Sequence, residues 1–375
     1  MEERNEVNLT TEEVEENLKF YDPDAAQIEL DGLATVSKEV TKSIVKLSDA
    51  QIRIILDGYY QVQGYRIILQ NQIRAVKQGY DSTDDYKLEA IEWLLADAVN
   101  RENQYKKLIA AYTKNVSVCR WATAIKGIGP VFAAILLSYI DMSKCRHANQ
   151  FLSYAGLNDN NTPWLGKEKA TELVNEAYKE FGLKNSDSAN EDVFQYIGER
   201  TGRTLHKVKT AFKRHKEKDT HKSTDKTILI KYLSMPPYNM ELKKLCFLIG
   251  ESFVKVSNRG SLYGEIYKER KAWETSMNEK GHYAEQAAQL LEEFNYSKDT
   301  DTYKCLIQGK LSPAHINMRA KRYAVKIFLT HFFEACWTYH YKTKPPVIYP
   351  IAFLDHVDYI EPEVPYSDYI TYKNE

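Results

Sequence analysis

The sequence predicts an all-α protein with a long N-terminal helical hairpin, a helix-hairpin-helix core and a small inserted helical subdomain. Three observations predict this class. Apolar residues recur at helical spacing from Ser43 onward. Polar N-cap residues and glycines separate these periodic segments. A Gly-x-Gly turn, Gly127 to Gly129, directly joins two apolar segments.

Composition fits a globular chain of two or three domains. The 375 residues are 43% hydrophobic and 27% charged, and one domain usually takes about 100–200 residues. The net charge of −1 excludes a uniformly basic, histone-like protein. Charge is unevenly distributed, however. Residues 1–40 hold twelve acids and three bases, whereas residues 203–231 hold ten Lys/Arg and three acids, and residues 310–344 hold seven Lys/Arg and one acid.

Several classes of protein are excluded by the pattern of apolar and cysteine residues. The longest apolar run, Val131 to Ile140, is far shorter than the roughly 20 residues of a membrane-spanning helix. The acidic N-terminus has no apolar signal core. We therefore expect a cytoplasmic protein without a membrane partner. The 5 cysteines include no C-x-x-C pair, which argues against a disulfide framework and a cysteine zinc site. No metal site is predicted.

In the N-terminal third, the charge and apolar patterns predict an acidic flexible arm over residues 1–40, followed by long helices over residues 41–114. Ile52, Leu56 and Leu69 suggest one long amphipathic helix, and a second is expected from about Tyr86 to Tyr112. The two helices can pair within the chain as a hairpin or serve as an arm for a homodimer.

Residues 115–165 hold the most distinctive local sequence. A helix over about Val116–Ala124 meets the turn Lys126-Gly127-Ile128-Gly129, and a second helix starts at Pro130. Two glycines allow positive φ in the turn and a close backbone approach. The free N–H groups of the second helix, with Lys126 beside them, suit a phosphate. The spacing is that of a helix-hairpin-helix, which grips nucleic-acid backbone; a tight turn without a ligand is the alternative.

Residues 166–234 read as a basic insertion with a helix-turn-helix pattern between Asp192 and Arg214. Gly202 suits the turn and Thr204 suits the cap of the second helix. A basic second helix is suited to the major groove of DNA; a plain helical hairpin with a solvated face is the alternative. The side chains expected on the exposed face of that helix are His206, Lys207, Lys209, Thr210 and Lys213.

Residues 235–345 predict further helices, and residues 346–375 an acidic, extended tail. Within the last long helix, Arg319, Arg322 and Lys326 fall on one face. This basic stripe can contact phosphates, or it can be the solvated face of an ordinary amphipathic helix.

The chain resembles a known family in two regions. Ile125-Lys-Gly-Ile-Gly-Pro130, followed by Phe151-Leu-Ser-Tyr-Ala-Gly-Leu157, is similar to the C-terminal domain of the DEDD-type insertion-sequence transposases related to the Piv invertase. The segments Asn239 to Leu245 and Tyr263 to Lys271 resemble later elements of that domain. The resemblance implies the DNA-binding half of a recombinase and, since such relatives use structured RNA guides, a potential RNA ligand.

Two departures from the family limit what the resemblance implies about catalysis. The family places a RuvC-like nuclease domain with four acidic metal ligands ahead of this region, and residues 1–84 are too short and too helical for it. The family's nucleophilic serine is absent from Asn158 to Gly166. Thr162 is the nearest hydroxyl, and Ser234 is the next candidate nucleophile if an insertion intervenes.

The sequence therefore predicts a transposase-like protein that binds duplex or branched DNA, in DNA recombination or in the biology of a mobile element, phage or plasmid. No cofactor is expected, and Mg²⁺ is expected only if the chain is catalytically active. Two alternatives stay open: an active serine-dependent recombinase completed in trans, and an RNA-binding or protein-scaffold module.

Overall fold

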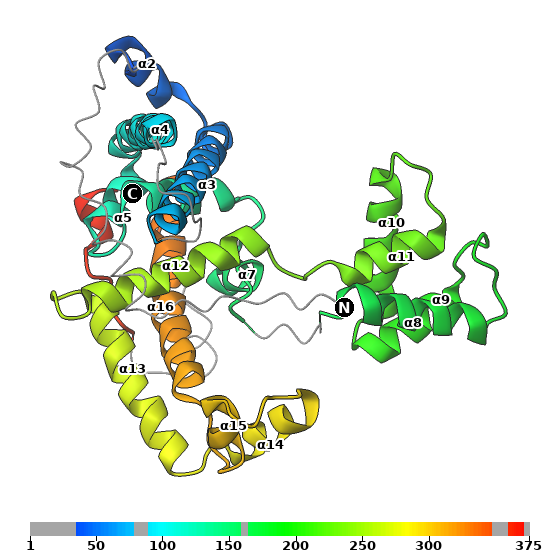
Figure 1. Cartoon of the computed structure of the whole chain (residues 1–375). Helices are drawn as coiled ribbons and strands as arrows, with labels where there is room; N and C mark the ends of the chain where they lie inside the picture. The colour runs from blue at the N-terminus through cyan, green and yellow to red at the C-terminus, as the bar shows by residue number, and fades with distance from the viewer. Residues whose placement is uncertain (1–34, 79–88, 159–163, 347–358, 371–375) are drawn as a thin grey trace. The chain divides into compact units, whose positions relative to one another are not determined.

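The protein is all-helical in the part of the chain described by the computed structural model, residues 35–78, 89–158, 164–346 and 359–370 (Figure 1). No strand occurs in these residues, which confirms the predicted fold class. The chain divides into two compact units, with the boundary between Asn115 and Val116. None of the helices in the described ranges combines the length and the apolar character needed to cross a bilayer.

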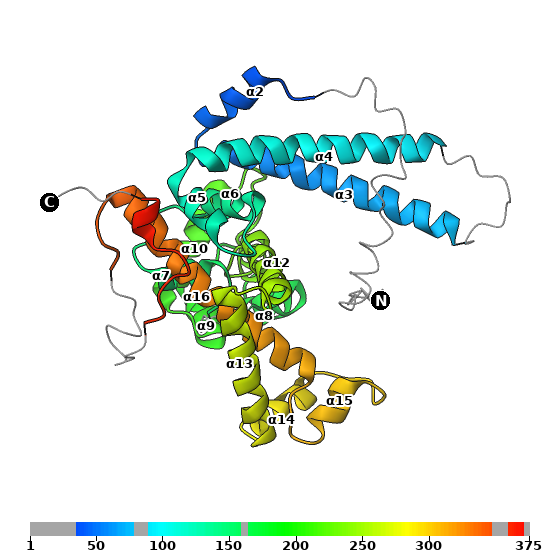
Figure 2. The same cartoon turned by 90° about the vertical axis from the view of Figure 1, so that its left-hand side faces the viewer.

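Two long antiparallel helices form the first unit (Figure 2). Leu56 and Ile109 are fully buried between them. The first long helix begins at Ile52, later than the apolar pattern suggests. In the turn before it, the Ser48 N–H donates to Gln51 Oε1 and the Gln51 N–H donates to Ser48 Oγ. The helices of this unit are α2 (Lys38–Ser43), the 3-10 helix η1 (Ile44–Lys46), α3 (Ile52–Lys77) and α4 (Glu89–Asn115).

A buried carboxylate also joins α3 to α4, and the apolar pattern gave no sign of it. Glu102 is 3% exposed and forms ion pairs with Arg66 and, at 2.8 Å, with Lys106. Burial opposes ionisation of this carboxyl, but hydrogen bonds from Lys106 and Arg66 outweigh it and lower the pKa of Glu102. The pair of helices α3 and α4 is therefore held together by a charged cluster as well as by apolar packing.

The second unit is built around one long helix, α16 (Pro313–Tyr341), which packs against four others. The aromatic residues Phe253, Tyr263, Phe328 and Phe332 form the centre of this packing, with Phe253 and Tyr263 stacked at 5.0 Å. The partner helices are α5 (Ser117–Ala124), α7 (Ala148–Tyr154), α12 (Met240–Val256) and α13 (Leu262–Glu279). Helix α6 (Pro130–Tyr139) packs on α5 and α12.

Two short helices, α14 (Ala284–Glu293) and α15 (Asp301–Leu306), connect α13 to α16 and pack around a small hydrophobic cluster that includes Ile316 of α16. The buried Asn278 at the end of α13 fastens this connection. Its side-chain amide donates to the Leu311 carbonyl and its carbonyl accepts from the Leu311 N–H, both at 2.9 Å. Both polar groups of the buried amide are thereby satisfied.

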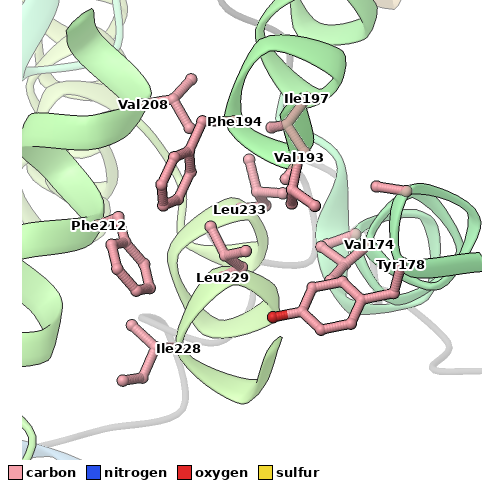
Figure 3. Close-up of a cluster of buried hydrophobic side chains, with 12 residues drawn as sticks. Val174, Tyr178, Val193, Phe194, Ile197, Val208, Phe212, Ile228, Leu229 and Leu233 are labelled. Carbon is pink, nitrogen blue, oxygen red and sulfur yellow. The ribbon is translucent and has the colours of Figure 1, made fainter. Parts of the chain in front are cut away.

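Residues 166–234 form four helices around a separate hydrophobic core (Figure 3). Side chains from all four helices point toward one another there, among them Val174, Ile197, Phe212 and Leu229. This segment therefore buries its apolar residues among themselves. The helices are α8 (Gly166–Glu180), α9 (Glu191–Thr201), α10 (Leu205–Lys218) and α11 (Asp225–Ser234).

The two ends of the segment 166–234 connect to the rest of the second unit at neighbouring points. The Asn239 N–H donates to the Tyr154 carbonyl at 2.8 Å, and the Asn239 amide donates to Tyr154 Oη at 2.7 Å. Farther out, Trp164 Nε1 donates to the Ser234 carbonyl at 2.9 Å. Because the ends of the segment are so close, it can be inserted between α7 and α12 without separating the residues on either side.

Candidate nucleic-acid interface

The turn between α5 and α6 occurs where the sequence predicts a hairpin. Gly127 has φ +95°, and a Cβ built on it would lie 3.2 Å from both Ser252 Oγ and Val256 Cγ2 on α12. Ser252 Oγ also donates to the Gly127 carbonyl at 2.6 Å. The close approach that requires this glycine is therefore to α12, within the protein.

Gly129 has a different role from the one expected. Its φ is −89°, so only one of the two glycines has a positive φ. It is the N-cap of α6, with Pro130 at the first helical position, and no side chain caps this end. The N–H groups of Val131 and Phe132 have no acceptor within the helix. A Cβ on Gly129 would meet nothing within 4 Å, so this end is sterically open.

Lys126 and Ile128 both make contacts within the protein. The Lys126 ammonium donates to the carbonyls of Arg259 at 3.0 Å and Gly260 at 2.9 Å. It thereby ties the hairpin to the turn between α12 and α13. Ile128 is 3% exposed and packs in the core. Two carbonyl groups hold the Lys126 ammonium, which the sequence did not indicate, and its role beside a bound phosphate stays a prediction.

The last turn of α12 and the α12–α13 turn carry two basic residues that the sequence did not point to, and the α12–α13 turn is bonded to the hairpin. Lys255 and Arg259 are both exposed, and Arg259 directly precedes the glycine that accepts from Lys126. The available signal was Asn258-Arg259-Gly260, a turn-type sequence between two helical patterns. It gave no indication that this turn lies beside the hairpin.

Helices α9 and α10 meet at the residues predicted for the helix-turn-helix pattern. Gly202 ends α9 with φ +66°, and Thr204 Oγ1 accepts from the Lys207 N–H at the start of α10. His206, Lys207, Thr210 and Lys213 are exposed, and their spacing places them on one face of α10. Lys209 differs from this group because its ammonium forms an ion pair with Glu191 on α9.

On α16, Arg319 forms an ion pair with a buried acid, and a phosphate contact by the stripe stays a prediction. The Arg319 guanidinium donates to Glu274 at 2.7 Å, and Glu274 is only 1% exposed. Arg270 and Tyr283 donate to the same carboxylate. Lys326 is half-buried and Arg322 is exposed. Because α13 packs along α16, the buried carboxylate of Glu274 lies against Arg319. The spacing of basic residues along α16 does not indicate this acid, since it belongs to another helix.

Of the two candidate nucleophiles, only Ser234 lies in the described residues. Ser234 is the last residue of α11, and its hydroxyl donates to the Lys231 carbonyl at 3.0 Å, a bond within the helix end. Thr162 lies outside the described residues. Within the described ranges, no group of three or more His, Cys, Asp or Glu side chains is arranged to hold a metal ion.

Comparison with known proteins identifies the segment that contains the hairpin. Residues 119–162 match the transposase IS116/IS110/IS902 family. The match runs from within α5 through the hairpin, α6 and α7, and it confirms the resemblance seen in the Gly-Ile-Gly-Pro and Tyr-Ala-Gly-Leu elements. No curated protein and no solved structure is significantly similar to the chain. A domain of this transposase family implies a DNA-binding, transposase-related role.

Proposed function

We propose that the chain binds the DNA backbone through the α5–α6 hairpin, as part of the recombination of a mobile element, phage or plasmid. The observation that carries the proposal is the open N-terminus of α6. Helix α6 has 10 residues, no side chain caps it, and space is free around Gly129. Unpaired N–H groups and the positive end of the helix dipole favour a phosphate at such a site.

Basic residues of the neighbouring turn support this proposal. Lys255 in the last turn of α12 and Arg259 in the α12–α13 turn are exposed, and the Lys126 ammonium ties that turn to the hairpin. Positive charge on the element bonded to the hairpin would draw the polyanion toward it. Contacts of this type hold the phosphate backbone and do not read the bases.

The insertion would supply a second contact through α10. The exposed face of α10 contains Lys207 and Lys213, together with His206 and Thr210. A basic helix that follows a short turn suits the major groove. The self-contained core of α8–α11 supports a module that presents this helix on a rigid frame.

The test is a matched pair of substitutions at Gly129. Gly129→Asp and Gly129→Asn both place a good N-cap side chain before Pro130, and both have free space around the new Cβ. Only Asp adds a negative charge where the phosphate is expected. Fluorescence anisotropy with a labelled DNA duplex should show binding about 10-fold or more weaker for Gly129→Asp than for Gly129→Asn, since a lost charge-assisted contact costs about 1.5–3 kcal/mol.

Thermal unfolding of both variants provides the control for this comparison. An acid at the N-terminus of a helix is stabilising, so the Asp variant should unfold at the same temperature as the Asn variant or higher. Equal DNA affinity of two folded variants would contradict the proposed role of the hairpin.

A further inference from the structure

Residues 359–370 lie against the second unit beside the α5–α6 hairpin, and hydrogen bonds to buried groups hold them there. Trp121 Nε1 on α5 donates to the Val364 carbonyl at 2.8 Å, and the Trp121 and Tyr366 rings pack at 5.4 Å. Trp121 is fully buried and Ile370 is 1% exposed. The segment carries Glu361, Glu363 and Asp368 and no basic residue. An acidic strip is thus fixed beside the surface proposed to meet DNA.

Helix α16 anchors the same segment through two buried polar residues. His331 Nε2 bonds to the Ile360 carbonyl at 2.8 Å. Tyr359 and Tyr366 both donate to Glu334 Oε2, at 2.7 and 2.6 Å. Glu334 is 4% exposed. These anchors hold the segment on both sides of Glu363 and do not involve its side chain.

The Glu363 carboxylate lies between the α5–α6 turn and the α12–α13 turn. One oxygen accepts from the Lys126 N–H in the hairpin at 3.4 Å, a long hydrogen bond, and the other accepts from the Leu262 N–H at 3.1 Å. Leu262 is the first residue of the 18-residue helix α13, and the Lys126 ammonium links the same two turns. Two backbone donors from separate elements therefore converge on one anionic group.

We propose that the N–H groups of Lys126 and Leu262 form a phosphate-binding site, and that Glu363 is the chain's own phosphate mimic, which a DNA phosphate replaces. This inference rests on the proposed function, because it adds a second phosphate contact and a competing carboxylate to the same hairpin. A carboxylate and a phosphate each offer oxygens that accept from a pair of N–H groups. These N–H groups are not those of the open α6 terminus.

Two properties of Glu363 favour its replacement. Burial raises the pKa of its carboxyl despite the hydrogen bonds from Lys126 and Leu262, so the ionised group is held there at a cost. The anchors at Tyr359, Ile360, Val364 and Tyr366 are independent of its side chain. The carboxylate can therefore turn away while the segment stays in place.

The experiment compares Glu363→Ala with Glu361→Ala in the full chain. Both variants remove one negative charge from the same segment, but Glu361 is exposed and donates or accepts no hydrogen bond in the described residues. If Glu363 competes with a phosphate, Glu363→Ala should bind a DNA duplex roughly 3- to 10-fold more tightly than Glu361→Ala. General electrostatics predicts equal gains in both variants, and that result would overturn the inference.

A second measurement separates this inference from the proposed function. Inorganic phosphate is titrated into Glu363→Ala and into the unsubstituted chain while the backbone amide resonances of Lys126 and Leu262 are followed. Saturable shifts of both amides in the variant alone support the site, even if neither protein binds DNA, in which case only the proposed function fails. DNA binding without such shifts overturns the inference and leaves the proposed function standing. If Glu363→Ala does not fold, Glu363→Gln replaces it, since its amide keeps one acceptor for an N–H and removes the charge.

Discussion

Gly127 and Gly129 are two residues apart in one turn, yet they do different things. Gly127 is required because its φ is positive and α12 lies against its α-carbon, so any side chain there strains the fold. Gly129 has an ordinary φ and open space around it. A substitution at Gly127 therefore tests stability, and a substitution at Gly129 tests access to the α6 terminus. The sequence shows both glycines but not the neighbour that distinguishes them.

His331 makes stability depend on pH in a defined direction. The Ile360 carbonyl can only accept, so Nε2 carries a proton, and Nδ1 lies 2.8 Å from Tyr263 Oη, from which the neutral ring accepts. Burial lowers the pKa of His331 from 6.5 to about 4. The unfolded chain takes up this proton at higher pH than the folded chain. The stabilising contribution is therefore complete above about pH 6.5 and is lost as the pH falls toward 4.

We expect His331→Gln to remove this part of the acid sensitivity. The shift corresponds to about 3 kcal/mol at most, at about 1.4 kcal/mol for each pKa unit. Urea unfolding at several pH values should show the free-energy difference between the parent chain and the variant shrinking by up to that amount from pH 6.5 to 4. The nearby Glu334, whose pKa is raised by burial, is present in both chains and cancels in the comparison. A constant difference across this range would contradict the neutral, buried assignment of His331.

Helix α10 is the element whose charge should be visible in the salt dependence of DNA binding. Its exposed Lys207 and Lys213 make no ion pair in the described residues, unlike Lys209. Replacing both lysines with Gln should reduce the slope of log affinity against log salt by about two, because each phosphate contact contributes close to one unit. The measurement is a set of duplex titrations over a range of salt concentrations.

The matched control for α10 lies in the same inserted segment. Lys167 and Lys169 are exposed on α8, and replacing both with Gln makes the same change in net charge. If this control lowers the slope as much as the α10 variant, the effect comes from overall charge, and α10 does not contact DNA.

At the level of elements, the sequence predicts turns and helix caps, which depend on neighbouring residues. It does not predict contacts between elements that are distant in the chain. The hairpin, the αL glycine at Gly202 and the cap at Thr204 follow from local backbone preferences, and the structure has them at those residues. The partners of Arg319 and Lys126 lie on other elements, at Glu274 and at the α12–α13 turn. One sequence carries no information on such pairings, so it did not show that these two basic side chains have partners within the protein.

At the level of the whole molecule, the near-zero net charge results from segments of opposite sign. The basic residues 203–231 include α10, and the acidic segment 359–370 is held against the hairpin through Trp121, His331 and Glu334. The sequence indicated both charge runs but not the contact between the acidic segment and the hairpin. That contact depends on hydrogen bonds between residues more than two hundred positions apart, as in the pair Trp121 and Val364.

The measurement that tests the central claim most directly is a salt-titrated binding assay with the full chain. It compares duplex DNA, a branched DNA junction, single-stranded DNA and structured RNA, with and without Mg²⁺, and each product is checked for cleavage. The proposed function predicts tighter binding to duplex or branched DNA than to the other ligands, with affinity falling steeply as salt increases. Absence of DNA binding at low salt, or a clear preference for structured RNA, would contradict it.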